Sequence, residues 1–284
     1  MDTRSTVAEN LEYPPCPLCG TDAILAKRYD LNPFVAVQCA NCRLWYLKPR
    51  LKEEHMLKLY ADGSYFMSDD ERGYSSYGAQ QQSLKFTFRR FLRQLNKNGY
   101  TGGRLLEVGC GYGYLLKEAQ PYFSYRAGTD YSEEAVKNAS QVCDRAILGG
   151  IDDIPPGETF DTIVTVGVIE HIYSPLEFNA KLSARLVNGG KLIHATPHMG
   201  SFWRHIMGTR WASFKIPEHV TYYDQNSLTK LFDKGGFRNL RRFSFPHAFP
   251  LSLVAEKLGM RVAGKLGALN LWLPATTLAI AGQK

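Results

Sequence analysis

The stretch that decides the fold is residues 104–114, with the sequence RLLEVGCGYGY. An apolar run typical of a buried strand leads into Gly109, Gly111 and Gly113, after which a helical pattern begins. Glycine at such a junction lets a ligand approach the backbone at the carboxyl end of a strand. We therefore expect these glycines to line a ligand site at the edge of a parallel sheet.

The charge beside the glycines indicates which ligand. A glycine-rich turn alone could bind a dinucleotide or be only a tight structural turn. Glu107 stands two residues before the first glycine, where a carboxylate would repel a pyrophosphate but suit a ligand that carries an ammonium and a sulfonium. Asp130 follows at the expected end of the next strand, where it can accept hydrogen bonds from both hydroxyls of a ribose. The favoured ligand is cationic.

From Gly103 onward, short apolar runs alternate with amphipathic segments, which is typical of a parallel sheet covered by helices. The predicted strands are 104–108, 125–129, 145–148, 160–166, 191–196, 239–245 and 275–282. The predicted helices are about 113–120, 132–142, 175–187 and 226–234, the last two ending at Gly189–Gly190 and Gly235–Gly236. The fold class is therefore α/β.

Two later segments complete the pattern. Ile151, Asp152 and Asp153 follow the third predicted strand, where they could line an adenine. Residues 160–172, FDTIVTVGVIEHI, give a buried strand that closes near Glu170. The ordered set of motifs is more specific than any single one of them.

Over about residues 100–245, the chain resembles the class I methyltransferases. EVGCGYG matches their first motif, Asp130 the ribose acid, FDTIVTVGVIEHI the fourth strand and LVNGGKLIHATP the fifth. The resemblance implies a Rossmann-like sheet of seven strands and methyl transfer from S-adenosylmethionine. The implied cofactor-binding residues are Glu107, Gly109, Gly111, Gly113, Asp130, Tyr131, Ile151, Asp152 and Gly167.

Four cysteines near the start form two pairs. CPLC at 16–19 and CANC at 39–42 give the spacing C-x2-C-x19-C-x2-C, which can supply four thiolates at tetrahedral geometry to Zn²⁺. Free thiols would leave this stretch with almost no core of its own. Because Cys16, Cys19, Cys39 and Cys42 fill all four positions, we expect a structural zinc ion.

Similar cysteine pairs precede one branch of the small-molecule methyltransferases, including those that act on nucleotide-linked sugars. A comparable ribbon precedes certain ribosomal RNA methyltransferases, where it helps to recognise RNA. We divide the chain into a zinc-binding ribbon (1–50), a helical connector and lid (51–100) and the methyltransferase domain (101–284).

The sequence predicts no membrane span at either end of the chain. The first fifteen residues lack the apolar core of a secretory signal, and we expect a cytoplasmic protein. Residues 266–283 carry no charge, but Asn270, Pro274 and two glycines argue against a span. Two short strands around a loop are expected there.

Methyl transfer is an in-line displacement, so a base is needed only if the acceptor must lose a proton. Three histidine groups are candidates: Glu170–His171, His194 with His198, and Glu218–His219. We favour His219, because it follows the fifth strand and an imidazole can take a proton near neutral pH. His194 is expected in the core, and His171 either anchors a loop or assists catalysis.

The segment IPEHVTYYDQNSL, residues 216–228, resembles the EHxxYF stretch of sugar C-methyltransferases that carry an N-terminal zinc domain. Those relatives have a tyrosine where this chain has Ile216, and their large C-terminal domain is not in this sequence. Because of these two departures, methylation of oxygen is favoured, and methylation of carbon is the alternative.

Two further features bear on the acceptor. Aromatic residues after the fifth strand, Trp203, Trp211, Tyr222 and Tyr223, could stack on a sugar or pack as a lid. Residues 84–98 present a basic helical face that could meet phosphates or simply be solvated.

The leading hypothesis is a methyltransferase for a small-molecule acceptor, such as a sugar, a glycoconjugate precursor or a secondary metabolite. An RNA acceptor recognised by the zinc ribbon is the first alternative, and the net charge of +7 is compatible with both. A non-catalytic module that binds the cofactor is the second alternative.

Overall fold

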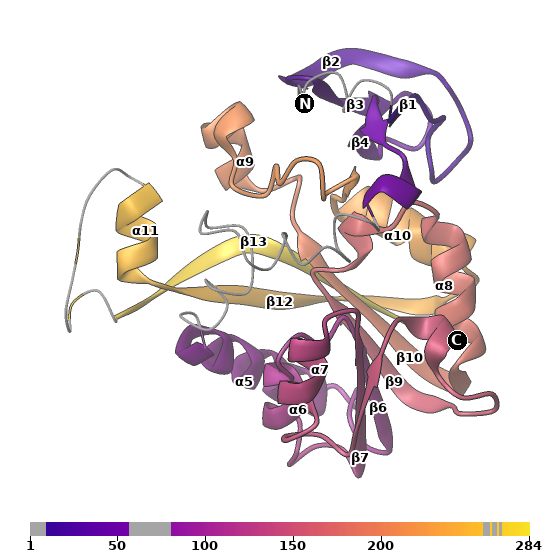
Figure 1. The fold of residues 1–284 in the computed structure, drawn as a ribbon, viewed down its shortest axis with the longest axis vertical. Coiled ribbons are helices and arrows are strands. Elements are labelled where there is room, and N and C mark those ends of the chain that lie inside the picture. The colour runs from indigo at the N-terminus through magenta and orange to yellow at the C-terminus, as the bar shows by residue number, and fades with distance from the viewer. Residues whose placement is uncertain (1–9, 57–80, 258–261, 263–265, 267–268) are drawn as a thin grey trace.

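The structure is a computed structural model of the 284-residue chain and describes residues 10–56, 81–257, 262, 266 and 269–284. Its centre is a seven-stranded sheet in the order β12-β13-β10-β9-β6-β7-β8 (Figure 1). The strands are β6 (Arg104–Val108), β7 (Tyr125–Asp130), β8 (Arg145–Leu148), β9 (Phe160–Val166), β10 (Leu186–Pro197), β12 (Arg238–Pro250) and β13 (Asn270–Gln283).

Six of these strands run in one direction, and β13 runs antiparallel between β10 and β12. The chain builds β6, β7 and β8 outward in one direction and then returns to place β9 on the other side of β6. Such a reversal opens a crevice at the carboxyl ends of the two central strands, which is where open α/β sheets bind their ligands.

Helices cover both faces of the sheet. They are α5 (Gln81–Lys97), α6 (Tyr114–Glu118), α7 (Glu133–Ala139), α8 (Pro175–Ala184), α9 (Phe202–Met207), α10 (Gln225–Lys234) and α11 (Leu251–Lys257), with short 3-10 helices η1 (Ile151–Asp153), η2 (Ile169–His171) and η3 (Gly208–Arg210). Side chains of β10 alternate between the two cores: Leu192 packs with α8 and α10, whereas Ile193 packs with α5 and α6.

Several predicted bounds differ from the structure. The strands predicted at 191–196 and 239–245 are longer, spanning Leu186–Pro197 and Arg238–Pro250. The helix predicted to reach 187 ends at Ala184, and Gly189–Gly190 lie inside β10 at an irregularity of its pairing with β9. The C-terminal segment forms one long strand, not two short strands around a loop. Pro274 and Ala275, which has a φ of 58°, lie where the β12–β13 register shifts, so the strand bends and continues.

The N-terminal segment forms two small sheets, β1 (Leu11–Glu12) with β5 (Arg50–Leu51), and β11-β4-β3-β2. The second contains β2 (Ile24–Leu31), β3 (Phe34–Cys39), β4 (Trp45–Leu47) and, from the chain after β10, β11 (Thr221–Tyr222). Figure 1 shows β4 and the strands beside it lying above α10.

The pairing of β4 with β11 joins the two parts of the molecule. Thr221 pairs with Tyr46, and the amide of Leu47 donates to the carbonyl of Val220 at 3.0 Å. Leu18 and Tyr46 share one core cluster with residues of α10. The domain boundaries at 50 and 100 stay a prediction, and residues 57–80 of the predicted connector and lid lie outside the described residues.

No helix in the described part of the chain is long and apolar enough to cross a bilayer.

Candidate active site

The glycine turn lies at the carboxyl end of β6 and requires its glycines. Gly109 has a φ of 72° and Gly111 a φ of 51°, in the region that L side chains rarely adopt. A Cβ added at Gly109 would lie 2.5 Å from Val168 Cγ2. At Gly113, with a φ of 73°, it would lie 3.0 Å from the Cα of Ala139. The turn therefore packs closely against its neighbours.

Asp130, at the end of β7, is fixed by two backbone donors. One carboxylate oxygen accepts from the amide of Gly111 at 2.8 Å and the other from the amide of Ser132 at 3.0 Å. Ser132 is also the N-cap of α7, because its hydroxyl accepts from the amide of Ala135. Hydrogen bonds from amides to a carboxylate hold it in one orientation beside the glycine turn.

Glu107 is buried on β6, with 3% of its surface exposed. Its Oε2 has no hydrogen-bond partner among the described residues. Burial, and next the charge of Asp130, raise its pKa well above the usual range. Buried polar atoms are rarely left unpaired, so this oxygen suits a ligand that brings a cation or a donor, as S-adenosylmethionine does.

The remaining predicted cofactor residues surround this crevice unevenly. Ile151 is buried, whereas Asp152 is exposed and its carboxylate accepts from the Lys181 ammonium at 2.9 Å. Tyr131 is 72% exposed and lies over Gly150, where an added Cβ would come within 2.4 Å of its hydroxyl. Gly167, directly after β9, has a φ of 69°. The structure thus buries Ile151, leaves Gly167 exposed at the carboxyl end of β9 and pairs Asp152 with Lys181 of α8.

The predicted catalytic residues come together from two distant segments. The rings of His171 and His219 meet edge to face, with centroids 4.6 Å apart. The buried carboxylate of Glu170 accepts from the Thr196 hydroxyl at 2.9 Å. Ligand atoms of Glu170, His171 and His219 all lie within 4.8 Å of one another.

The protonation of His219 follows from its partner. Its Nδ1 lies 2.9 Å from the carbonyl oxygen of Ser213. A carbonyl can only accept, so Nδ1 carries the proton and Nε2 carries the lone pair of the neutral ring. Burial, followed by electrostatic interaction with His171 and with Lys215, lowers the pKa of His219 well below its ordinary value.

Burial also lowers the pKa of His171 to about 4 and raises that of Glu170 to about 7. Glu218, which is buried, contributes a backbone hydrogen bond to His171. At neutral pH both imidazoles are therefore uncharged, as a base that must accept a proton requires.

Backbone contacts explain why these segments meet. The amide of Val220 donates to the carbonyl of Glu170 at 2.9 Å, so the strand that pairs with β4 also runs along η2. His194, by contrast, is a core residue bonded to Thr165 and Asn179. Thr196 and Ser213, which hold Glu170 and His219, were not predicted, because no sequence signal marks either one.

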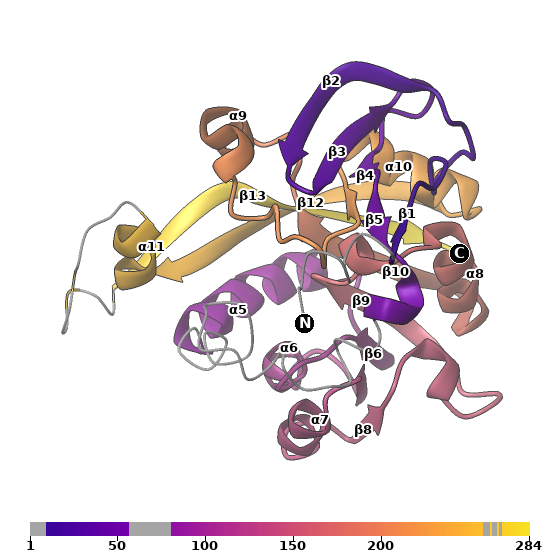
Figure 2. The same ribbon diagram turned by 45° about the horizontal axis from the view of Figure 1, so that its top comes forward.

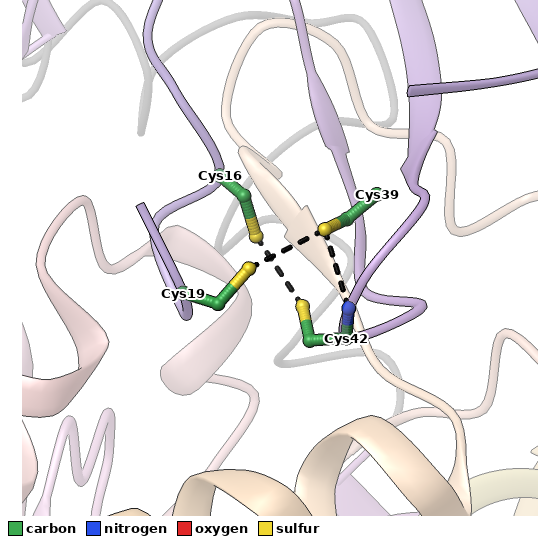
Figure 3. Close-up of side chains that lie close together, drawn as sticks. All are labelled: Cys16, Cys19, Cys39 and Cys42. Atoms are coloured by element: carbon green, nitrogen blue, oxygen red, sulfur yellow. Dashed lines mark hydrogen bonds between the residues drawn. The ribbon is translucent and has the colours of Figure 1, made fainter. Parts of the chain in front are cut away.

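The four cysteines converge as predicted (Figure 3). Sγ atoms of Cys16 and Cys42 lie 3.4 Å apart, as do those of Cys19 and Cys39, and all four thiols are free. These separations are too long for a disulfide. They are close to the roughly 3.8 Å that four sulfurs 2.3 Å from a tetrahedral zinc would show. The donor set therefore fits Zn²⁺.

Two tight turns place the sulfurs. The amide of Gly20, with a φ of 73°, donates to the carbonyl of Cys16 at 2.8 Å. Arg43, with a φ of 70°, donates in the same way to Cys39 at 3.2 Å. Each pair of cysteines thus comes from a turn that points both thiols inward.

The fold and the crevice define an S-adenosylmethionine-dependent methyltransferase of class I. Residues 78–242 match a protein family described as a methyltransferase domain, and the chain belongs to this family. This match covers more than half of the chain and contains the glycine turn and Asp130.

Two curated relatives match at modest identity. A ubiquinone biosynthesis O-methyltransferase from Bradyrhizobium diazoefficiens is 27% identical over 48% of this chain and 61% of its own length. A tRNA U34 carboxymethyltransferase from Glaesserella parasuis is 30% identical over 48% of this chain and 46% of its own length. The chain thus spans about half the length of these relatives.

A solved S-adenosylmethionine-dependent methyltransferase from Archaeoglobus fulgidus shares the fold. It has a TM-score of 0.53 and 16% identity, and the alignment covers 80% of this chain and 99% of that chain.

Proposed function

We propose that the chain methylates a hydroxyl of a small-molecule acceptor, such as a sugar, a glycoconjugate precursor or a secondary metabolite, with His219 as the general base. The observation that carries this proposal is the neutral imidazole of His219, whose Nδ1 is held by Ser213 and whose Nε2 carries the lone pair. The curated O-methyltransferase relative supports oxygen as the acceptor atom.

In this proposal the cofactor lies in the crevice between β6 and β9. Gly109, Gly111 and Gly113 allow its close approach, and Asp130 accepts from the ribose hydroxyls. Glu107 faces the charged end of the methionine, Gly167 lines the methyl side, and Tyr131, Ile151 and Asp152 lie toward the adenine. S-Adenosylmethionine supplies the methyl group as a sulfonium substituent.

His171 and Glu218 serve His219 in this scheme. The ring of His171 packs against that of His219, and the Glu218 backbone bonds His171, so the three residues fix one imidazole orientation. Because the acceptor proton must leave as the methyl arrives, a base held in place lowers the barrier of the same step.

The experiment is His219→Asn, because an asparagine amide can still donate toward the Ser213 carbonyl. We expect turnover of labelled methyl donor with a metabolite extract to fall about 10²- to 10⁴-fold, while calorimetric affinity for the cofactor stays within about twofold. The matched control is His205→Asn. His205 lies on α9, and its Nδ1 is also 2.9 Å from a backbone carbonyl oxygen, that of Ser201. Unchanged turnover in His219→Asn would reject the base.

The tRNA-modifying relative supports a second candidate function, methylation of an RNA acceptor. RNA affinity should then fall steeply as salt rises, with a slope set by the number of phosphates contacted. Affinity that is flat across salt would remove this candidate. Because the chain belongs to a methyltransferase family, we do not propose the second alternative, a module that binds the cofactor without catalysis.

We further propose that the four cysteines hold a structural Zn²⁺. Their thiolates would fill all four coordination positions, which leaves none for a substrate. The ion would then stabilise β3 and β4, and through β4 the strand that follows His219.

A further inference from the structure

The exposed apolar side chains of this molecule are concentrated in one region. Of the eleven large hydrophobic side chains that are exposed in the described part of the chain, seven lie on three segments. They are Phe86 of α5, Phe202 and Ile206 of α9, and four residues between 266 and 272. We call these seven side chains the arm surface.

The three segments surround the outer half of the β12–β13 hairpin, with α5 on one side, α9 on the other and α11 at the outer end (Figures 1 and 2). The guanidinium of Arg90 on α5 lies 5.4 Å from the ring centre of Trp272. The indole of Trp203 on α9 donates to the carbonyl of Pro274 at 2.8 Å. Contacts from both helices thus hold this end of the hairpin in place.

Basic side chains of α5 lie beside the arm surface. Helix α5 carries five lysines and arginines and no acid, whereas Arg238, Arg241 and Arg242 lie at the opposite end of the β12–β13 hairpin, paired with residues 280–283. Apolar side chains beside a concentration of basic ones match the interface of an anionic bilayer.

We propose that the arm surface docks the protein on the surface of a membrane that contains anionic lipids. Four of its seven side chains are aliphatic, namely Ile206, Leu266, Leu269 and Leu271, with exposures from 37% to 62%. Aliphatic groups insert among acyl chains, and the three remaining side chains, Phe86, Phe202 and Trp272, are aromatic ones of the kind enriched at the bilayer interface. A second copy of the chain would bring two basic surfaces together, which is unfavourable.

Docking in this way would bring the catalytic region close to the bilayer. Helix α9 follows β10 directly, and the same connection continues through η3 to His219. The inference concerns where the enzyme acts and does not depend on His219 being the base or on the nature of the acceptor.

The test is sedimentation of the full chain with vesicles of phosphatidylcholine alone and with vesicles in which one third of the lipid is phosphatidylglycerol. We expect binding to the anionic vesicles that weakens as salt rises. The double variant Leu271→Asp/Trp272→Asp should lower the partition coefficient roughly tenfold or more, and Arg90→Gln about fivefold. The matched control is Ile24→Asp, because Ile24 on β2 is 46% exposed and lies outside the arm surface.

Calorimetric affinity for S-adenosylmethionine and the thermal midpoint verify that each variant is folded. Three results would overturn the proposal: no sedimentation with anionic vesicles, an equal loss in Ile24→Asp, or equal binding to both kinds of vesicle. A double variant that converts a dimer to a monomer, or that loses RNA binding instead of vesicle binding, would assign the surface to another partner and also overturn it.

Discussion

At the scale of single residues, Asp130 is held by two amides before any ligand arrives. The expected role of this carboxylate is to accept from ribose hydroxyls. Asp130→Asn keeps its size but removes its charge and one acceptor, and we expect the dissociation constant for S-adenosylmethionine to rise roughly 10- to 100-fold. Calorimetry measures it, with Asp233→Asn, an exposed acid on α10, as the control. Equal affinity in both variants would remove Asp130 from the cofactor site.

Glu170 predicts a dependence of stability on pH. Its pKa in the folded chain is about 7, above the ordinary 4.5, because burial disfavours the charged form. The folded state therefore holds this proton more tightly than the unfolded state, and stability falls as pH rises from about 4.5 to about 7.

Glu170→Gln should therefore match the wild type near pH 4 and exceed its free energy of unfolding by up to about 3 kcal/mol above pH 7. Urea unfolding at both pH values checks this, and Glu177→Gln, an exposed carboxyl on α8, should change little at either. A difference that does not vary with pH would mean that Glu170 is already charged in the folded protein.

At the scale of elements, the glycine that precedes α6 sets how closely this helix lies to α7. Gly113 and Gly99 have nearly the same φ, 73° and 72°, but only Gly113 has neighbours within 4 Å of an added Cβ. Alanine at Gly99 should cost about 1 kcal/mol from backbone strain alone. Alanine at Gly113 should cost roughly 1–3 kcal/mol more, because α7 must shift. Urea unfolding compares the two, and equal costs would contradict the close packing.

Local pattern was enough to predict most elements. The strands 104–108, 145–148 and 160–166 have the predicted bounds, because each is a short apolar run ended by a glycine or a polar residue. Periodicity could not predict β11, since two residues carry no period and its partner β4 lies far away in the chain. For the same reason, the sequence suggested His171 and His219 separately but not their contact, which depends on how the chain closes.

At the scale of the whole molecule, the cysteine cluster holds together the N-terminal segment, which is joined to the rest by the pairing of β4 with β11. Cys39→Ser should lower the zinc content per chain and the thermal midpoint, because a structural zinc site contributes directly to folding. It should also lower turnover, since β4 supports the strand that follows His219. Metal analysis and thermal unfolding measure these effects.

The control for the cluster is Cys143→Ser, which changes a half-buried thiol outside it. Its metal content should equal that of the wild type. Full metal content in Cys39→Ser, or no metal in the wild type after growth with added zinc, would contradict the structural zinc ion.

The shared sheet of β2, β3, β4 and β11 also limits how this enzyme can be recombined with its relatives. A chimaera that exchanges only the first fifty residues would leave Thr221 and Tyr222 facing a foreign edge strand. A chimaera that folds must therefore exchange residues 211–223 together with the cysteine-bearing segment, although the two stretches lie far apart in the gene.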